Sequence, residues 1–137
     1  MGSDKEIAVR QAADDFYDAL NAMFKGDVAP MTAVWSHAED VVYMGPGGSI
    51  KVGWDKVQKD WEGQAARKLG GKVNPKDVHF TVGDKLAVMY AMESGENTNI
   101  GGKREKVAIR VTNLFRHENG AWKMIGHHTD LLAGIKG

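Results

Sequence analysis

The stretch that decides the fold runs from Val111 to Asp130 and reads VTNLFRHENGAWKMIGHHTD. Two runs in which apolar and polar residues alternate flank an Asn-Gly pair at positions 119 and 120. Asn-Gly is typical of the two-residue turn of a β-hairpin, because both residues readily adopt positive φ. The sequence therefore predicts two antiparallel strands, over residues 106–116 and 121–130, joined by a tight turn.

The elements outside this hairpin follow from the spacing of apolar residues. Apolar residues at helical spacing predict three helices, over residues 4–25, 30–35 and 54–68. β-prone runs predict further strands over residues 41–44, 78–82 and 86–93, with a turn-rich connection over residues 96–102. Helices that mostly precede a meander of strands favour an α+β fold over alternating βαβ units. We expect one domain over residues 1–137, cone-shaped, in which helices pack on the concave face of a curved antiparallel sheet and enclose a small, mostly apolar pocket.

The composition excludes several classes of function. Lys and Arg together number 18, as do Asp and Glu, so no positive excess is available to bind nucleic acid. The chain has no Cys, which excludes disulfides, thiolate nucleophiles and cysteine zinc sites. No apolar run approaches the roughly 20 residues that span a bilayer, so no membrane partner is expected. The first residues show no apolar signal core, and we expect a cytoplasmic protein, or a periplasmic or secreted one if a signal peptide has been removed.

Motifs for metals, phosphates and serine nucleophiles do not occur in the sequence. His127 and His128 are adjacent, so in a strand they point to opposite faces and cannot share a metal ion. The glycine-rich run at 45–48 is not followed by Gly-Lys-Ser/Thr, and Gly-x-Ser-x-Gly is absent. We therefore expect no metal and no cofactor.

Side-chain alternation in the hairpin assigns candidate pocket residues. A regular hairpin around the Asn-Gly turn gives three cross-strand pairs, which are Phe115–Met124, Asn113–Gly126 and Val111–His128. These pairs place the more apolar residues on the inner face, together with Asn113, His128 and Asp130. Polar groups in such a setting are either satisfied core groups or parts of a ligand site. The opposite face mixes polar and apolar residues, which suits solvent or a dimer partner.

Acid–base chemistry is the reaction type that these residues favour. Histidine is the side chain whose intrinsic pKa suits proton transfer near neutrality, and Asp130 on the same face as His128 would orient it or raise its basicity. Tyr17, on the long first helix, would donate a hydrogen bond to a developing oxyanion, and its alternative role is that of a core tyrosine. We therefore assign His128, Asp130 and Tyr17 as candidate catalytic residues. The candidate residues for binding a small apolar or aromatic ligand are Trp35, Tyr43, Tyr90 and Asn113, and each aromatic among them is otherwise ordinary core.

Three segments of the chain carry a family resemblance. They are the first helix ending in Gly26-Asp27-Val28, the run from Trp35 to Gly48 with Gly53-Trp-Asp-Lys-Val after it, and the hairpin from Val111 to Asp130. Together they resemble the SnoaL-like branch of the nuclear transport factor 2-like superfamily, to which ketosteroid isomerases also belong. The resemblance covers nearly the whole chain. It implies a cone-shaped α+β barrel with a deep pocket, into which the His128 position often points, and a homodimer packed through the sheet.

The chain departs from the ketosteroid isomerases at their catalytic positions. Those enzymes place a catalytic aspartate just before the proline that follows the early strand, where this chain has Gly45. Their catalytic tyrosine aligns near Ala19 rather than with Tyr17. The resemblance therefore implies the fold and the pocket without ketosteroid isomerase activity.

Two main functional readings follow from the sequence. The first is a small-molecule-binding protein or cofactor-independent acid–base enzyme of isomerase, cyclase or lyase type. The second is an association module, similar to the oligomerising domain of calmodulin-dependent kinases, whose pocket is filled by its own side chains. A redesigned scaffold is a weaker third reading, because designs avoid irregular turns and buried polar groups.

Overall fold

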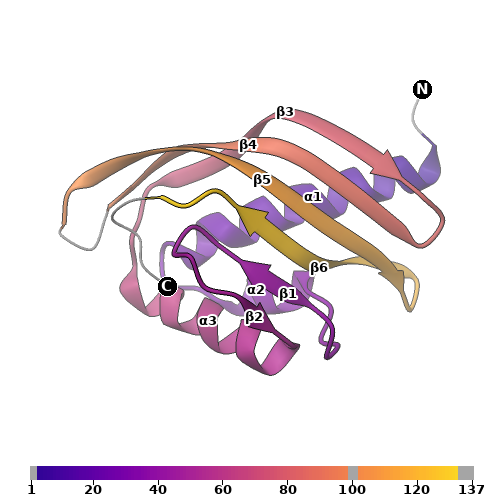
Figure 1. The fold of residues 1–137 in the computed structure, drawn as a ribbon, viewed down its shortest axis with the longest axis horizontal. Coiled ribbons are helices and arrows are strands. Elements are labelled where there is room, and N and C mark those ends of the chain that lie inside the picture. Colours follow the sequence, from indigo (N-terminus) through magenta and orange to yellow (C-terminus); the bar gives the residue numbers. More distant parts are fainter. Residues whose placement is uncertain (1–2, 99–101, 133–137) are drawn as a thin grey trace.

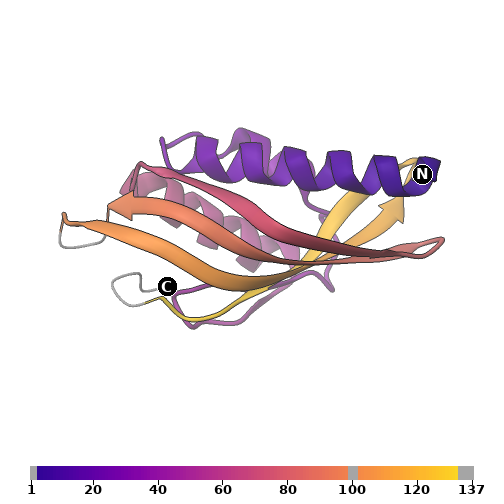
Figure 2. The ribbon, with the colours of Figure 1, turned by 90° about the horizontal axis from the view of Figure 1, so that it is seen from above.

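The computed structural model describes residues 3–98 and 102–132. In this part of the chain three helices lie on one side of a curved six-stranded sheet (Figures 1 and 2). The strand order across the sheet is β2-β1-β6-β5-β4-β3. This arrangement confirms the predicted α+β fold.

The helices begin and end close to the predicted positions. They are α1 (Asp4–Met23), α2 (Ala29–Val34) and α3 (Trp54–Arg67). Ser3 caps α1, because its side-chain oxygen accepts a hydrogen bond from the Glu6 N–H at 3.1 Å. The buried stripe of α1 contains Val9, Ala13, Phe16, Tyr17, Leu20 and Met23. The apolar residues that recur at helical spacing in this segment therefore form the buried face of α1.

The strands are β1 (Val42–Met44), β2 (Lys51–Val52), β3 (Lys72–Val82), β4 (Leu86–Thr98), β5 (Arg104–Glu118) and β6 (Ala121–Thr129). β3 and β4 are longer than predicted, because they pair with each other through a polar stretch as far as Lys72 and Glu96. The predicted turn at 96–102 accordingly overlaps the end of β4, and residues 99–101 lie outside the described residues. The two residues of β2 carry too little pattern to predict a strand.

One pairing in the sheet differs from the predicted antiparallel meander. β1 pairs in parallel with β6, with Tyr43 opposite His127, whereas the other pairs between the described strands are antiparallel. β1 and β6 are far apart in the chain, so no tight turn requires them to run in opposite directions. The sheet is therefore mixed, and the prediction of a purely antiparallel sheet is wrong at this strand.

The Asn-Gly turn forms as predicted. Asn119 and Gly120 both have positive φ, at 50° and 80°, between the paired residues Glu118 and Ala121. Two positive φ values in succession define the turn that matches the twist of antiparallel strands. The turn therefore fixes the pairing of β5 with the first residues of β6.

A β-bulge then changes the pairing farther along the hairpin. Phe115 pairs with Met124, but the next residue, Leu114, pairs with Gly126, so Ile125 is an extra residue in β6. At this point the Met124 carbonyl accepts a hydrogen bond from the Ser36 N–H at 2.9 Å, a contact from outside the hairpin. Beyond the bulge every side chain of β6 faces the opposite way from a regular hairpin.

The core lies between the helices and the sheet. Its largest fully buried side chains include Trp35, Trp61, Phe16, Phe115 and Met89. These residues come from α1, α3 and the central strands, and from the loop after α2, so the core joins both layers of the fold. No helix among the described residues is both long and apolar enough to cross a membrane.

Candidate functional site

Four buried polar side chains form a hydrogen-bonded chain between the sheet and α1. His127 Nδ1 lies 2.6 Å from Asn113 Oδ1, and Asn113 Nδ2 donates to Tyr17 Oη at 3.0 Å. Tyr17 Oη in turn donates to Glu93 Oε2 at 2.9 Å. The four residues belong to β6, β5, α1 and β4, and none is more than 4% exposed. Folding therefore brings together side chains from four elements that are as far apart in the sequence as residues 17 and 127.

These hydrogen bonds all donate toward Glu93. Tyr17 gives its only proton to Glu93, so it accepts from the amide nitrogen of Asn113, and the amide oxygen of Asn113 faces His127. His127 accordingly carries its proton on Nδ1 and keeps a lone pair on Nε2, which lies 4.0 Å from Glu93 Oε2. The direction of the chain stabilises a negative charge on Glu93.

Burial sets the protonation of this chain. Desolvation raises the pKa of Glu93 to about 7, while the hydrogen bond from Tyr17 opposes the rise. Desolvation lowers the pKa of His127 to about 3, with a smaller contribution from His128. Desolvation, and then the charge of Glu93, raises the pKa of the Tyr17 phenol. At neutral pH, His127 is therefore a neutral imidazole and Tyr17 a neutral phenol, and Glu93 titrates in the range useful for proton transfer.

A small cavity lies against Glu93 and His127. Its volume is about 30 Å³, which is room for about one water molecule. The walls are mainly apolar and include Phe24, Trp61, Ile109 and Leu132. A few polar groups among apolar walls are typical of small-molecule sites. In the present conformation, however, the space is too small for anything larger than a water molecule, and a larger ligand requires a wall residue to move.

The Tyr43 side chain is a wall of this cavity and occupies the space beside Gly45. Its ring stacks on the His127 ring at 5.6 Å, and Gln64 Nε2 donates to its hydroxyl at 2.8 Å. A Cβ placed on Gly45 would lie only 1.9 Å from the Tyr43 hydroxyl oxygen. The Tyr43 phenol therefore occupies the space that a side chain at position 45 would need. This packing gives a physical reason why the chain has glycine where ketosteroid isomerases have a carboxylate.

Two indole donors are buried without a hydrogen-bond partner among the described residues. They are Nε1 of Trp35 and Nε1 of Trp61. A buried donor that makes no hydrogen bond costs about 1–3 kcal/mol, so such donors are uncommon. Trp61 also lines the cavity, and a water or a ligand acceptor there would reduce this cost.

Of the residues predicted for the pocket, Tyr43 lines the cavity. Tyr17 and Asn113 are inward-facing links of the buried chain that reaches the cavity at Glu93 and His127, but they do not line it themselves. Trp35 is buried too, but it packs in the core against Trp54 and Trp61 and does not line the cavity. The roles of these residues in binding or catalysis stay predictions.

The placement of His128, Asp130 and Tyr90 on the inner face is wrong. The bulge at Ile125 turns His128 outward, where it is exposed. Asp130 lies beside Arg110 on the outer side, with two side-chain hydrogen bonds of 2.9 Å, and this guanidinium lowers the pKa of Asp130 to about 2. Tyr90 is 53% exposed on the outer face of β4, because Ala91 and Met89 on either side of it point inward.

Glu93 and His127 are the site residues that the sequence reasoning missed. Glu93 follows Ala87, Met89 and Ala91 at the alternating inward positions of β4, so strand alternation is a signal that could have found it. His127 has no such signal, because its inward orientation depends on the bulge. The inward position of Glu93 could be predicted from the periodicity of β4, whereas that of His127 depends on tertiary structure.

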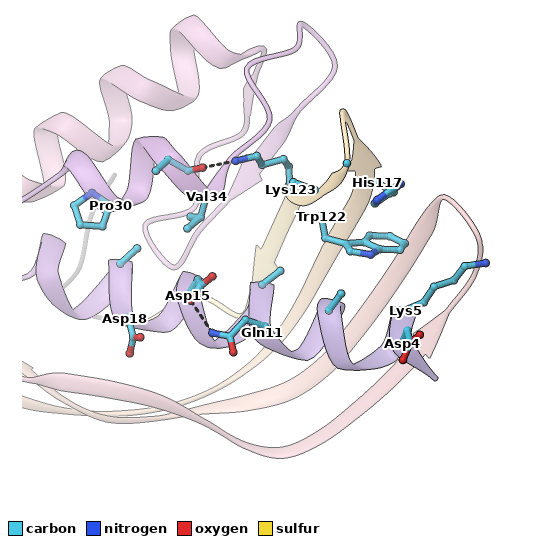
Figure 3. A pocket seen from close by; sticks show the side chains of 16 residues that line it. Asp4, Lys5, Gln11, Asp15, Asp18, Pro30, Val34, His117, Trp122 and Lys123 are labelled. Carbon is cyan, nitrogen blue, oxygen red and sulfur yellow. Dashed lines mark hydrogen bonds between the residues drawn. The ribbon is translucent and has the colours of Figure 1, made fainter. Parts of the chain in front are cut away.

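A larger hollow than this cavity is a surface groove elsewhere on the protein (Figure 3). It has a volume of about 740 Å³ and lies between α1, α2 and the β5–β6 hairpin, with Trp122 and His117 at the hairpin end. Lys123 Nζ donates to the Ala33 carbonyl at 2.8 Å and ties the hairpin to α2 (Figure 3). No member of the buried chain lines this groove. The perturbed titratable groups therefore favour the smaller cavity as the candidate site.

Metal binding finds no support in the described residues, where no group of three or more His, Cys, Asp or Glu could hold an ion. The polar side chains that line the cavity are those of Glu93, His127, Tyr43, Gln64 and Asn97, together with the Trp61 indole. Among them, Glu93 has a pKa of about 7, which suits proton transfer.

The curved sheet, the helices packed on it and a cavity with a buried polar end define the class of nuclear transport factor 2-like α+β proteins. Within it, the chain belongs to the SnoaL-like domain family, whose family model matches residues 9–133. This membership confirms the resemblance seen in the sequence. None of the curated proteins matches the chain.

Solved structures from bacteria share this fold. A protein of Streptomyces avermitilis, from the NTF2-like family and proposed to be a dehydratase, has a TM-score of 0.79 at 22% identity, covering 93% of this chain and 95% of its own. A protein of Thiobacillus denitrificans, proposed to be a calcium/calmodulin-dependent protein kinase type II association domain, has a TM-score of 0.74 at 26% identity, covering 90% and 94%. A proposed ketosteroid isomerase of Shewanella frigidimarina has a TM-score of 0.71 at 17% identity, covering 90% and 94%. These similarities establish the fold and leave the activity open.

Proposed function

We propose that this protein binds a small, largely apolar molecule in the cavity at Glu93, and that Glu93 exchanges a proton with it. The observation that carries the proposal is the buried chain of hydrogen bonds that donate toward Glu93, a carboxyl with a pKa near 7. A buried polar cluster with a purely structural role does not require a group that titrates near neutral pH. A general acid or base, in contrast, works best when its pKa is near the working pH.

The roles divide between one reacting group and its supports. Glu93 is the proposed general base or acid, and the Tyr17 hydroxyl holds its Oε2. Asn113 is a positioning residue, because it acts on Glu93 through Tyr17, while His127 orders Asn113 and also lines the cavity. The reaction class is cofactor-independent proton transfer of isomerase, cyclase or lyase type. Gly45 stands where ketosteroid isomerases have their aspartate, and the Tyr43 hydroxyl fills the space of a side chain there, so we do not propose ketosteroid isomerase activity.

Ligand entry requires the cavity to grow at its mouth. Leu132 lines the cavity and follows β6, and its N–H donates to the Pro46 carbonyl at 3.1 Å. This backbone contact holds Leu132 beside the β1–β2 turn. Moving a single side chain here costs less than repacking the core around Trp61 and Ile109. We therefore place the entrance between Leu132 and Pro46.

The test is calorimetry of small fragments with the wild type and Glu93→Gln, in two buffers that differ in ionisation enthalpy. Fragments from a mixed aromatic and alicyclic set are first selected by ligand-observed NMR. A fragment that binds the cavity is expected to exchange a proton with the buffer in the wild type near pH 7 and to exchange fewer in Glu93→Gln. Tyr90→Ala, on the outer face, serves as the matched control. Equal proton exchange in wild type and Glu93→Gln would remove Glu93 from the proposal.

A second candidate function is an oligomerising module, and we propose in either case that the outer sheet face joins two copies of the chain. The supporting observation is that the face exposes Leu86, Tyr90 and Leu114, at 58%, 53% and 38%. Exposed apolar residues grouped on one face often mark an interface. Light scattering after size exclusion is expected to give a dimer or larger species, and Tyr90→Lys combined with Leu114→Lys is expected to dissociate it. A wild-type monomer at micromolar concentration contradicts both the dimer and the module.

A further inference from the structure

Within the described part of the chain, Glu93 and His127 each leave one hydrogen-bond acceptor open at the cavity, whereas the Trp61 indole N–H is an open donor on its wall. Glu93 Oε2 is bound by Tyr17, while no hydrogen bond within the described residues occupies Glu93 Oε1. His127 donates through Nδ1 to Asn113, so its open Nε2 presents a lone pair. A ligand that pairs with these two acceptors must therefore bring hydrogen-bond donors.

The same end of the cavity has no positive charge to balance an ionised Glu93. Among the described residues that line the cavity, none is Lys or Arg. An ionised carboxylate in an apolar cavity without a counter-ion is costly. A cationic donor from the ligand would remove that cost.

The aromatic walls suit a cation as well. The rings of Tyr43 and Trp61 lie 4.7 Å apart with their planes 56° apart, and both residues line the cavity beside Glu93. The faces of tyrosine and tryptophan attract ammonium groups, by about 0.5–2 kcal/mol in favourable sites. Three independent features, namely open acceptors, missing counter-charge and aromatic faces, thus select the same kind of head group.

We infer that the ligand is an amine on a compact apolar body, bound as an ammonium that donates to Glu93 Oε1 and His127 Nε2. This inference rests on the proposed function, and it names the chemical class of the molecule that binds there. The apolar body would take the place of Leu132 at the mouth of the cavity. In a reaction, the proton that Glu93 removes would come from the nitrogen of the bound amine, which leaves a neutral nucleophilic amine and a protonated Glu93.

Proton balance gives the inference a pH signature. Below pH 7 Glu93 carries a proton, so binding an ammonium releases one proton to solvent, since the bound pair is ammonium and carboxylate. The affinity for the amine should then rise with pH through about 7 and fall again above the pKa of the amine itself. From pH 6 to pH 8 the expected gain is about tenfold.

The experiment compares benzylamine, benzyl alcohol and benzoate, which share a ring and differ in the charge of the head group. Binding is measured by calorimetry and by the shift of the thermal midpoint, at pH 6 and pH 8. We expect benzylamine to bind most tightly, with an affinity that falls on the order of tenfold in Glu93→Gln, the loss typical of a hydrogen bond to a charged group. Benzoate is expected not to bind, and Tyr90→Ala is expected to bind benzylamine as the wild type does.

Leu132→Ala keeps the test decisive if Leu132 closes the wild-type cavity too tightly. It removes the side chain at the mouth, away from Glu93, so benzylamine is expected to bind this variant at least as well as the wild type. If benzyl alcohol binds with exchange of a proton that depends on Glu93 while benzylamine does not bind, the amine inference is wrong and the proposed function stands. If none of the three compounds binds either the wild type or Leu132→Ala, both are wrong.

Discussion

Glu93→Gln should change the stability of the protein in a pH-dependent way, because the variant keeps the shape of the side chain and removes its titration. Glu93 is 4% exposed, with a pKa of about 7 in the folded protein against 4.5 for the ordinary carboxyl. Between these two pH values the folded state holds a proton that the unfolded chain has already lost. The free energy of unfolding that Glu93 contributes is therefore greatest below pH 4.5 and decreases as the pH rises to about 7.

The magnitude follows from the two pKa values. Each pH unit between them is worth about 1.4 kcal/mol, so the contribution of Glu93 falls by about 3 kcal/mol from pH 4.5 to pH 8. Burial of His127 has the opposite sign, since its pKa is lowered from 6.5 to about 3 and its contribution rises with pH over that range. His127 is present in both proteins, so its contribution cancels in the difference between them.

Urea unfolding at pH 5, 6, 7 and 8, followed by tryptophan fluorescence, measures this difference. Relative to the wild type, Glu93→Gln is expected to gain stability steadily with rising pH, by about 2–3 kcal/mol over this range. Asp84→Asn is the control, because Asp84 is exposed in the turn between β3 and β4 and the hydrogen bond from Lys5 lowers the pKa of its carboxyl. A difference between Glu93→Gln and wild type that stays constant with pH would refute the claim that Glu93 is protonated in the folded protein near neutrality.

Two further predictions test the packing of the site. Tyr17→Phe removes the donor to Glu93 and the acceptor of Asn113, and is expected to lower the free energy of unfolding by about 1–3 kcal/mol, more at pH 8 than at pH 6, whereas Tyr90→Phe should change it by less than about 0.5 kcal/mol. Equal losses at both pH values would show that Tyr17 does not stabilise the ionised carboxyl. Gly45→Ala brings a methyl group against the Tyr43 hydroxyl and is expected to cost about 1–3 kcal/mol, whereas Gly63→Ala, on α3 with open space around it, is expected to stabilise by up to about 1 kcal/mol. A Gly45→Ala protein as stable as the wild type would show that Tyr43 does not fill that space.

The elements and the inner face of most strands could be predicted from the sequence because they depend on local periodicity. The α1 stripe, the Asn-Gly turn and the inward positions of β5 are each read within one element. The parallel pairing of β1 with β6 could not be read in this way, since it joins segments about eighty residues apart. The alternation of side chains along β4 is also sufficient to predict that Tyr90 points outward and Glu93 inward.

The bulge at Ile125 shows why the site itself escaped the sequence. In a regular hairpin, Gly126 would lie opposite Asn113 and no imidazole would reach its amide. The Ser36 N–H binds the carbonyl of Met124 beside the extra residue, and from there His127 rather than His128 faces inward. We therefore expect the position of His127 to depend on this contact from the loop after α2, about ninety residues earlier in the chain.

This dependence links the fold to the proposed chemistry. With His127 inward and Asn113 between it and Tyr17, each donor in the chain is used and the last one ends on Glu93. His128 in that place would stand in a hairpin of different register, and the contact that orders Asn113 would be lost. His127→Leu should then leave the Asn113 oxygen without a donor, destabilise the protein by about 1–3 kcal/mol and weaken the hold of Tyr17 on Glu93. His128→Leu changes an exposed side chain, so it should neither destabilise the protein nor weaken the hydrogen bond from Tyr17 to Glu93. If the two variants were equally stable, the orientation that the bulge gives to His127 would not matter for the site.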